Sequence, residues 1–277
     1  KKAHMAGYCL GGTLLSIALA GLMHSGDERV ASMSLFAAQI DFTEAGELTL
    51  FIDESEVSFL EDMMWEQGFL DTRQMSGAFQ LLRSNDLIWS KGVREYLLGE
   101  RAQMFDLMAW NADGTRMPYK MHSEYLTGLF LHNDFAEGRW KVDSVPVSVE
   151  DIRLPIFAVG TEHDHVAPWK SVFKISHLAD TEVTFVLTAG GHNAGIVSEP
   201  GHKHRHYHIM TAPEHNGYID ADTWKTQAAY REGSWWEAWV DWLGSRSGPA
   251  AQLPEMGKAD AGYEVLAAAP GSYVLMS

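Results

Sequence analysis

The chain has 277 residues, of which 46% are hydrophobic and 21% are charged, proportions typical of a globular protein in water. It carries 21 Lys and Arg against 37 Asp and Glu, and the resulting formal net charge of −16 argues against nucleic acid as a partner, because phosphate binding needs a surplus of basic side chains. No apolar run approaches the roughly 18 residues of a membrane-spanning helix, and a single cysteine cannot form an internal disulfide, so we expect no membrane span and a cytoplasmic location.

The first predicted element is a sharp turn from a strand into a helix around Cys9. The segment GYCLGG places Cys9 at the centre of a Gly-x-Cys-x-Gly motif, where α/β-hydrolases commonly carry a nucleophilic serine. Gly7 and Gly11 suit such a turn, because a Cβ atom would clash there. At a helix N-terminus, the helix dipole and nearby amides favour the thiolate. Cys9 is therefore a candidate nucleophile; the alternative is a buried cysteine beside a glycine-rich helix start.

The sequence begins close to this turn. It opens at Lys1, shows no charged and then apolar leader, and reaches Gly7 within a few positions. In hydrolases several strands precede the nucleophile turn. We therefore expect the N-terminal part of the sheet to be missing from this chain.

The next two segments continue an α/β pattern. Residues 11–26 carry small and apolar side chains at helical spacing and end with a Ser-Gly stop signal. Residues 29–42 predict a short strand that is apolar on both faces, as in parallel sheets. The order of strand, sharp turn, helix and strand assigns residues 1–42 to the first part of a hydrolase core.

The composition changes in residues 43–150. Helical patterns interrupted by glycines predict a mostly helical insert that forms a cap over the active site. Its large apolar side chains exceed what a few short helices need for one another, and they include Met63, Met64, Trp65, Trp89, Phe105 and Trp110. We expect some of them to face the active site or a partner subunit; the alternative is that all of them form the core of the cap.

The α/β pattern returns in residues 151–277, the second part of the expected hydrolase core. One strand is predicted from about Leu154 to Val159 and another from about residue 183, with a helical stretch between them, which suits a β-α-β unit. Residues 248–262 have the composition of a loose linker. The predicted fold is α/β, an α/β-hydrolase fold with a mostly helical cap insertion.

An acid and a histidine follow the two late strands. Asp164 comes after the first of them and His192 after the second, in a glycine-rich loop. Hydrolases place nucleophile, acid and base along the chain in this order, at the ends of successive strands. Each residue alone could be an ordinary surface residue, but their order predicts a triad of Cys9, Asp164 and His192.

Four histidines alternate with other residues in GHKHRHYH. If this segment were a strand, His202, His204, His206 and His208 would share a face and could bind zinc. No acid or cysteine completes the set at ligand spacing, so we expect a solvated polar loop and no metal.

The segment SWWEAWVDWL spaces Trp235, Trp239 and Trp242 along one face of a predicted helix. A carbohydrate platform is one interpretation of such a row of indoles. Packing of the helix against the sheet is the interpretation we favour.

Taken together, these motifs resemble the catalytic domain of a class I-like, short-chain polyhydroxyalkanoate synthase. Those enzymes carry a cysteine in a lipase-like box, matched by GYCLGG, an acid in a segment matched by GTEHDHVAPW, and a histidine in one matched by GGHNAGIV. The likeness continues through SNDLIW, WNADGTRMPYKMHSEYL, GSWWEAWVDWL and the terminal APGSYV. It therefore covers nearly the whole chain; only upstream residues of the family, one of which is expected to help bind the oxyanion, have no counterpart.

The resemblance implies an acyltransferase that polymerises (R)-3-hydroxyacyl-CoA into polyester and releases CoA. Cys9 would be the nucleophile, Asp164 the acid and His192 the base, and the Leu10 backbone N–H would supply one oxyanion donor. No cofactor is implied, because the CoA thioester is the substrate. The expected partners are the growing polyester, a second copy in a homodimer, and the surface of polymer granules in the cytoplasm.

Two other functions remain compatible with the same residues. A cysteine hydrolase or thioesterase would use the same triad and let water resolve the acyl-enzyme. A non-catalytic granule-associated module would retain only binding surfaces if the missing part of the sheet abolished activity. The role of Asp164 is also open, since it could orient His192 or help it deprotonate the incoming 3-hydroxyl group.

Overall fold

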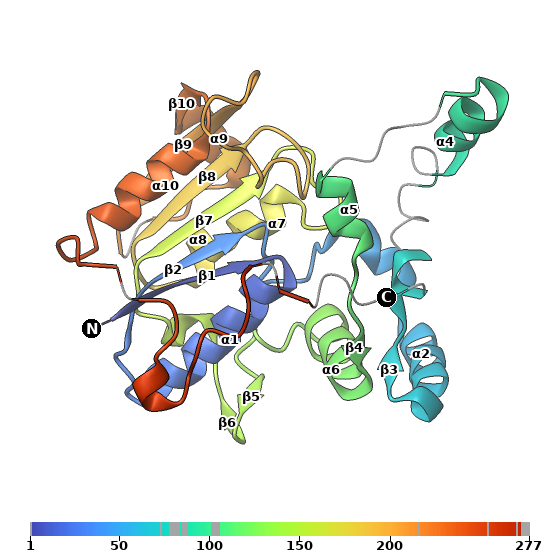
Figure 1. The fold of residues 1–277 in the computed structure, drawn as a ribbon, viewed down its shortest axis with the longest axis horizontal. Coiled ribbons are helices and arrows are strands. Elements are labelled where there is room, and N and C mark those ends of the chain that lie inside the picture. The colour runs from blue at the N-terminus through green and yellow to red at the C-terminus, as the bar shows by residue number, and fades with distance from the viewer. Residues whose placement is uncertain are drawn as a thin grey trace.

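The computed structural model describes residues 2–72, 74–77, 84, 88–100, 106–214, 217–253, 255–269 and 271–272. Its central feature is a six-stranded sheet with the strand order β1-β2-β7-β8-β9-β10 (Figure 1). The strands are β1 (Ala3–Tyr8), β2 (Val30–Phe36), β7 (Ile156–Thr161), β8 (Val183–Thr188), β9 (His206–Ala212) and β10 (Ala229–Glu232). The first four run parallel, and β9 and β10 join by antiparallel pairing.

The middle strands are buried on both faces, as their sequences predict. Every residue of β7 and β8 is buried. Ile156 and Ala158 belong to one apolar cluster, while Phe157 and Val159 belong to another, because successive side chains of a strand point to opposite faces. β7 begins after Pro155, which has no N–H to donate to a sheet ladder.

One face of the sheet is covered by α1 (Leu10–His24) together with α7 (Trp169–Phe173), α8 (Ile175–Leu178) and α9 (Ala221–Gln227). Helices α7 and α8 connect two parallel strands, so the β-α-β unit predicted between β7 and β8 is confirmed. Small residues let α1 approach the sheet closely, and a Cβ atom on Gly12 would overlap that of Ala38.

The other face is covered by α10 (Trp235–Gly244). Trp235 and Trp242 are buried against Phe157, and the Nε1 atom of Trp239 donates a hydrogen bond to Ser34 Oγ at 2.9 Å. The predicted packing of this tryptophan-rich helix on the sheet is confirmed.

Short helices dominate the segment between β2 and β7. They are η1 (Gly46–Phe51), α2 (Glu54–Gln67), α4 (Ser90–Gly92), η3 (Val93–Leu97), α5 (Asp106–Ala112), α6 (Tyr119–Tyr125), η4 (Leu126–Leu131) and η5 (Val149–Asp151). Asp53 caps α2 by accepting a hydrogen bond from the Glu56 N–H, and Gly68 ends it in a left-handed conformation. Figure 1 shows α2, α5 and α6 beside the end of the sheet at which β1 and β2 finish.

Two small antiparallel strand pairs in this segment were not predicted. They pair β3 (Phe69–Leu70) with β4 (Met117–Pro118), and β5 (Lys141–Val142) with β6 (Val145–Pro146). Strands of two residues are too short to show an alternating pattern. The β3–β4 pair joins residues that are far apart in the sequence, which local patterns do not indicate.

The large apolar side chains of the insert are divided between core and surface. Met64 is fully buried, whereas Trp65, Trp89 and Trp110 are 75%, 70% and 57% exposed. The alternative in which all of them form the core of the cap is therefore wrong. Phe105 and parts of the SNDLIW and APGSYV motifs lie outside the described residues.

The histidine-rich segment differs from the expectation of a loop. His202 and His204 lie in a loop, but His206 and His208 belong to β9, where both rings contact Tyr230. The prediction failed because the strand forms between β8 and β10, a tertiary pairing that histidines do not signal.

The segment with the composition of a linker has little regular structure. Residues 248–253 and 255–257 have no helix or strand, and η6 (Ala259–Ala261) is a single exposed turn.

Candidate active site

Cys9 occupies a strained turn between β1 and α1. Tyr8 ends the strand, Leu10 begins the helix, and Cys9 itself has φ +51° and ψ −128°, a conformation that non-glycine residues rarely adopt. Hydrogen bonds hold the residue in place: the Cys9 N–H donates to the Phe36 carbonyl at 2.9 Å, and the Cys9 carbonyl accepts from the Gly12 N–H at 2.9 Å. The side chain is therefore presented at the N-terminus of α1, near the unpaired first N–H groups of the helix.

The glycines around Cys9 have unequal roles. A Cβ atom on Gly7 would lie 2.5 Å from Gly12 Cα and 2.6 Å from the Gly11 carbonyl oxygen, and one on Gly12 would overlap Ala38. A Cβ atom on Gly11 would meet nothing within 4 Å. The expectation that Gly11 avoids a clash is therefore wrong, and Gly12 is the second glycine that the turn requires.

Asp164 lies in the loop after β7 with its carboxylate fully buried. Its Oδ1 atom accepts hydrogen bonds from the backbone N–H groups of Val166 at 2.9 Å and Ala167 at 2.8 Å, and its Oδ2 atom accepts from Thr161 Oγ1 at 3.1 Å. These three donors fix the orientation of the carboxylate toward His192.

His192 lies in the loop after β8 with its side chain 12% exposed; it is hydrogen-bonded to Asp164 and lies close enough to Cys9 for its pKa to respond to the thiol. Its Nδ1 atom is 2.8 Å from Asp164 Oδ2 and 3.1 Å from Oδ1. Burial lowers the pKa of His192, but hydrogen bonds to Asp164 and Cys9, together with the charges of both, outweigh it and raise the pKa to about 9. Because Asp164 occupies Nδ1, Nε2 is the ring nitrogen left for Cys9. The structure thus brings Cys9, Asp164 and His192 together.

Tyr8 is a polar neighbour of the triad that the sequence analysis missed. Its hydroxyl donates a hydrogen bond to Asn193 Oδ1 and lies 3.3 Å from the His192 carbonyl oxygen, and its ring centroid is 5.2 Å from that of His192. Burial, followed by the charges of Cys9 and Asp164, raises the pKa of Tyr8 well above its ordinary value. Tyr8 is therefore a neutral donor, and its position next to Cys9 was the one available signal.

The insert also contributes side chains near Cys9. The ring centroid of Trp110, on α5, is 6.5 Å from that of Tyr8, and Asn193 Nδ2 donates to Asn111 Oδ1 at 3.3 Å. Tyr125, on α6, has its pKa raised by burial and then by the charge of Cys9. Aromatic side chains of the insert thus flank the candidate nucleophile.

The candidate metal ligands form ion pairs and ring contacts instead of a cluster. His206 Nε2 lies 3.2 Å from Glu162 Oε2, and Lys225 Nζ lies 2.9 Å from Glu162 Oε1. Within the described residues, no three His, Cys, Asp or Glu side chains are grouped to hold a metal ion. Every helix in the residues that the structure describes is too short or too polar to span a membrane.

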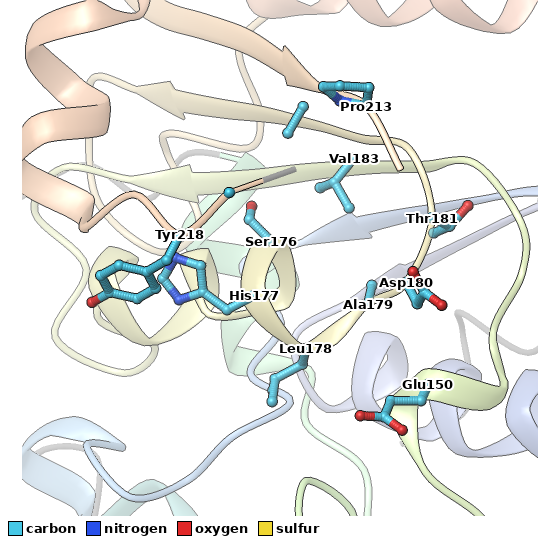
Figure 2. Close-up of a pocket in the computed structure, with 12 residues that line it drawn as sticks. Glu150, Ser176, His177, Leu178, Ala179, Asp180, Thr181, Val183, Pro213 and Tyr218 are labelled. Atoms are coloured by element: carbon cyan, nitrogen blue, oxygen red, sulfur yellow. The ribbon is translucent and has the colours of Figure 1, made fainter. Parts of the chain in front are cut away.

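A cavity of about 380 Å³ lies away from the triad (Figure 2). Its lining includes Val183, the first residue of β8, and Ala212, the last residue of β9, whereas the triad residues follow the carboxyl ends of β1, β7 and β8. The cavity therefore lies at the opposite ends of the strands from the triad. His177 and Tyr218 line it, with their rings tilted to one another and their centroids 4.7 Å apart.

Curated relatives match the chain over almost its full length. It is 39% identical over 273 residues to poly(3-hydroxyalkanoate) polymerase of Methylorubrum extorquens, which covers 98% of the chain and 44% of the relative. Poly(3-hydroxyalkanoate) polymerase subunit PhaC of Rhizobium meliloti is 40% identical over 277 residues, and that of Cupriavidus necator 33% identical over 280 residues; each match covers 99% of the chain, and 44% and 46% of the respective relative. The chain thus spans less than half the length of these relatives. No family model matches it.

Similarity to solved structures is weaker. A monoacylglycerol lipase from Paleococcus ferrophilus has a TM-score of 0.42 and 14% identity, covering 89% of this chain and 70% of the lipase. An α/β fold family hydrolase from Bacillus anthracis has a TM-score of 0.38 and 14% identity, covering 70% of this chain and 62% of the hydrolase. The α/β-hydrolase fold of this chain is evident from its own parallel strands, sharp nucleophile turn and late acid and histidine loops.

Proposed function

Since this chain belongs to the poly(3-hydroxyalkanoate) polymerase family, we propose that it carries the catalytic centre of an acyltransferase that converts (R)-3-hydroxyacyl-CoA into polyester. The observation that supports this proposal best is the hydrogen bond of His192 to the buried Asp164, with Cys9 close enough to affect the pKa of His192 and held in a strained turn at the start of α1. A thiol suits this substrate, because exchanging one thioester for another changes the free energy little. The proposed substrates are short-chain thioesters such as 3-hydroxybutyryl-CoA.

Acylation of Cys9 is the proposed first step. Nε2 of His192 takes the proton from Sγ, and the thiolate attacks the thioester carbonyl carbon. The oxyanion that forms is stabilised by the Leu10 N–H, one of the first helix amides that have no partner within α1. When the C–S bond to CoA breaks, the CoA sulfur takes the proton from His192 and leaves as the free thiol, with the acyl group on Cys9.

Chain elongation is the proposed second step. The hydroxyl of a 3-hydroxyacyl unit gives its proton to His192 and attacks the Cys9 thioester carbonyl. The ester bond forms as the C–S bond to Cys9 breaks, and His192 returns the proton to Sγ, which restores the Cys9 thiol. The buried Asp164 carboxylate accepts bonds from Val166, Ala167 and Thr161 in addition to His192. This arrangement favours a role in orienting His192 over direct contact with the incoming hydroxyl.

The alcohol must compete with water for the acyl-enzyme. Trp110 and Tyr125 of the insert lie near the Tyr8–Cys9 turn and provide an aromatic surface that restricts water around the thioester. The same triad in a water-accessible site would act as a cysteine hydrolase or thioesterase, so the product distinguishes the two functions.

We also propose that the exposed apolar side chains of the insert serve assembly. Trp65, Trp89 and Tyr96 are 75%, 70% and 88% exposed, and large apolar side chains at the surface are the kind of group that protein and polymer surfaces cover. A second copy of the chain and the surface of polymer granules in the cytoplasm are the proposed partners.

The test is to supply 3-hydroxybutyryl-CoA and to measure released CoA and the acyl product together. The chain and a longer protein with additional upstream residues are assayed in parallel, with Cys9→Ala as the matched variant. We expect insoluble polyester and stoichiometric CoA from the active protein, and neither product from Cys9→Ala. Free hydroxy acid in place of polyester would indicate a thioesterase, and polymer formation by Cys9→Ala at the wild-type rate would exclude Cys9 as the nucleophile.

A further inference from the structure

The loop that carries His192 is held by side-chain donors from two other elements. Its residues 191–197 form a short turn in which the Gly195 N–H donates to the Gly191 carbonyl at 2.8 Å and the Val197 N–H donates to the Asn193 carbonyl at 2.9 Å. These bonds use carbonyls at the start of the turn. The later carbonyls, of Ala194, Gly195 and Ile196, accept from distant side chains instead.

The donors come from Arg205 and from the first residues of α10. Arg205 Nη2 donates to the Ala194 carbonyl at 2.8 Å. The indole Nε1 atoms of Trp235 and Trp236 donate to the carbonyls of Gly195 at 3.0 Å and Ile196 at 2.9 Å. Ser234, which caps α10 by accepting from the Trp236 N–H at 3.0 Å, also donates its hydroxyl proton to the Ser198 carbonyl.

We propose that Arg205, Trp235 and Trp236 are positioning residues that act through His192, because they fix the loop whose register places the imidazole against Cys9. We refer to these three residues as the loop clamp. The inference rests on the proposed function, since it assigns to the clamp the alignment of the proposed base with the proposed nucleophile.

Burial makes the clamp bonds hard to replace. Trp235 is 1% exposed and Gly195 is buried, so the Gly195 carbonyl would have no water to accept from if the indole were lost. Leaving a buried carbonyl without a hydrogen bond is unfavourable, so the loop would move to regain a donor. A shift of the loop by a fraction of an ångström would change the Nε2–Sγ geometry directly.

The loop also packs against Thr161, whose hydroxyl is hydrogen-bonded to the acid of the triad. A Cβ atom on Gly195 would lie 2.6 Å from Thr161 Cγ2, and Thr161 Oγ1 donates to Asp164 Oδ2 at 3.1 Å. Arg205 lies against the other end of the loop, with Nη1 3.4 Å from the Ala189 carbonyl oxygen. A Cβ atom on Gly190, whose φ is +109°, would be 2.9 Å from that nitrogen. Arg205 therefore contacts the loop both before His192, at Ala189, and after it, at Ala194.

A matched control lies on the same helix. Trp239 donates from its indole to Ser34 Oγ at 2.9 Å, so Trp239→Phe removes a bond of the same chemistry and length from α10 without touching the histidine loop. Trp236→Phe removes the bond to Ile196 while keeping an aromatic ring. A merely structural role predicts equal effects of the two substitutions on the site.

The test measures the rate at which iodoacetamide alkylates Cys9 as a function of pH. Cys9 is the sole cysteine, so the modification reports one atom. We expect Trp236→Phe to be alkylated about tenfold more slowly than the wild type at neutral pH, because a displaced His192 no longer accepts the Cys9 proton. Trp239→Phe should change Tm about as much as Trp236→Phe does, but it should be alkylated at the wild-type rate at every pH. If Trp236→Phe does not fold, Arg205→Lys, which keeps the charge and loses the two-carbonyl grip, is measured in its place.

The outcomes separate the two proposals. A wild-type profile that is unchanged in Trp236→Phe, or altered equally in Trp239→Phe, overturns the loop clamp and leaves the triad intact. A wild-type profile that does not change in His192→Ala overturns the proposed function, and the loop clamp with it.

Discussion

Nδ1 of His192 lies 2.8 Å from Oδ2 of Asp164, a carboxylate that is fully buried and receives further hydrogen bonds from two backbone N–H groups and a threonine hydroxyl. The acid is therefore fixed before substrate arrives, and it fixes the imidazole in turn. If Asp164 orients His192 in this way, loss of Asp164 should slow every step in which His192 transfers a proton.

Substitution of the acid tests this role. In Asp164→Asn the amide NH2 would face either His192 or the Val166 and Ala167 N–H groups, so at least one hydrogen bond is lost or reversed. We expect acylation of Cys9 to slow by about 10²- to 10⁴-fold, approaching the effect of His192→Ala. Trapping of labelled acyl-enzyme measures it. Normal acylation followed by a stall in elongation would show instead that Asp164 acts on the incoming hydroxyl.

The raised pKa of His192 predicts a pH-dependent contribution to stability. A histidine whose pKa rises from 6.5 to about 9 on folding stabilises the protein fully below pH 6.5, and this stabilisation is lost as the pH rises through about 9. The shift corresponds to at most about 3 kcal/mol. Denaturant unfolding of the wild type and His192→Ala should give free energies whose difference narrows over this range, and a constant difference would contradict the raised pKa.

Cys9 is one cause of that raised pKa, so its removal has a separate consequence. Cys9→Ala deletes a hydrogen bond and a charge interaction with His192 while leaving the Asp164 contact in place. We expect the pKa of His192 in Cys9→Ala to lie between its ordinary value and about 9. An NMR titration of the imidazole measures both proteins, and identical titration curves would mean that the thiol does not contact the ring.

The glycines of the nucleophile turn provide a fourth prediction. Gly7→Ala and Gly12→Ala place a Cβ atom against atoms that cannot move without shifting α1 or β2, so each should lower the free energy of unfolding by about 1–3 kcal/mol. Gly11→Ala is the matched control: its Cβ atom points into open space inside a helix, where alanine gains up to about 1 kcal/mol over glycine. Thermal unfolding should separate the three variants, and equal losses at Gly7 and Gly11 would contradict the geometry of the turn.

The sequence predicted the parts of the site that depend on local patterns. Cys9 is marked by a glycine-rich turn, and Asp164 and His192 each follow an apolar strand, so chain order alone was enough to bring them together. Tyr8, by contrast, meets Asn193 across more than 180 positions, and no local pattern encodes that contact. The same holds for β9, whose histidines become a strand only because β8 and β10 pair with it.

The last prediction concerns movement of the insert. Helix α5 touches the site through the Trp110–Tyr8 ring contact and one 3.3 Å hydrogen bond between Asn193 and Asn111, while Trp110 remains 57% exposed. These two interactions lie at an exposed surface, where they are easily broken, and acyl-CoA can enter if α5 moves away from Tyr8. Hydrogen exchange over residues 43–150 should therefore change when a nonhydrolysable acyl-CoA analogue is added, and again on dilution if a second copy covers the exposed indoles.

The variant Asn111→Ala should raise hydrogen exchange in α5 even without the analogue. Lys120→Ala, which removes an exposed ion pair of α6, is the control. Unchanged protection under both conditions would make the insert a rigid lobe, and access to Cys9 would then have to come from another side.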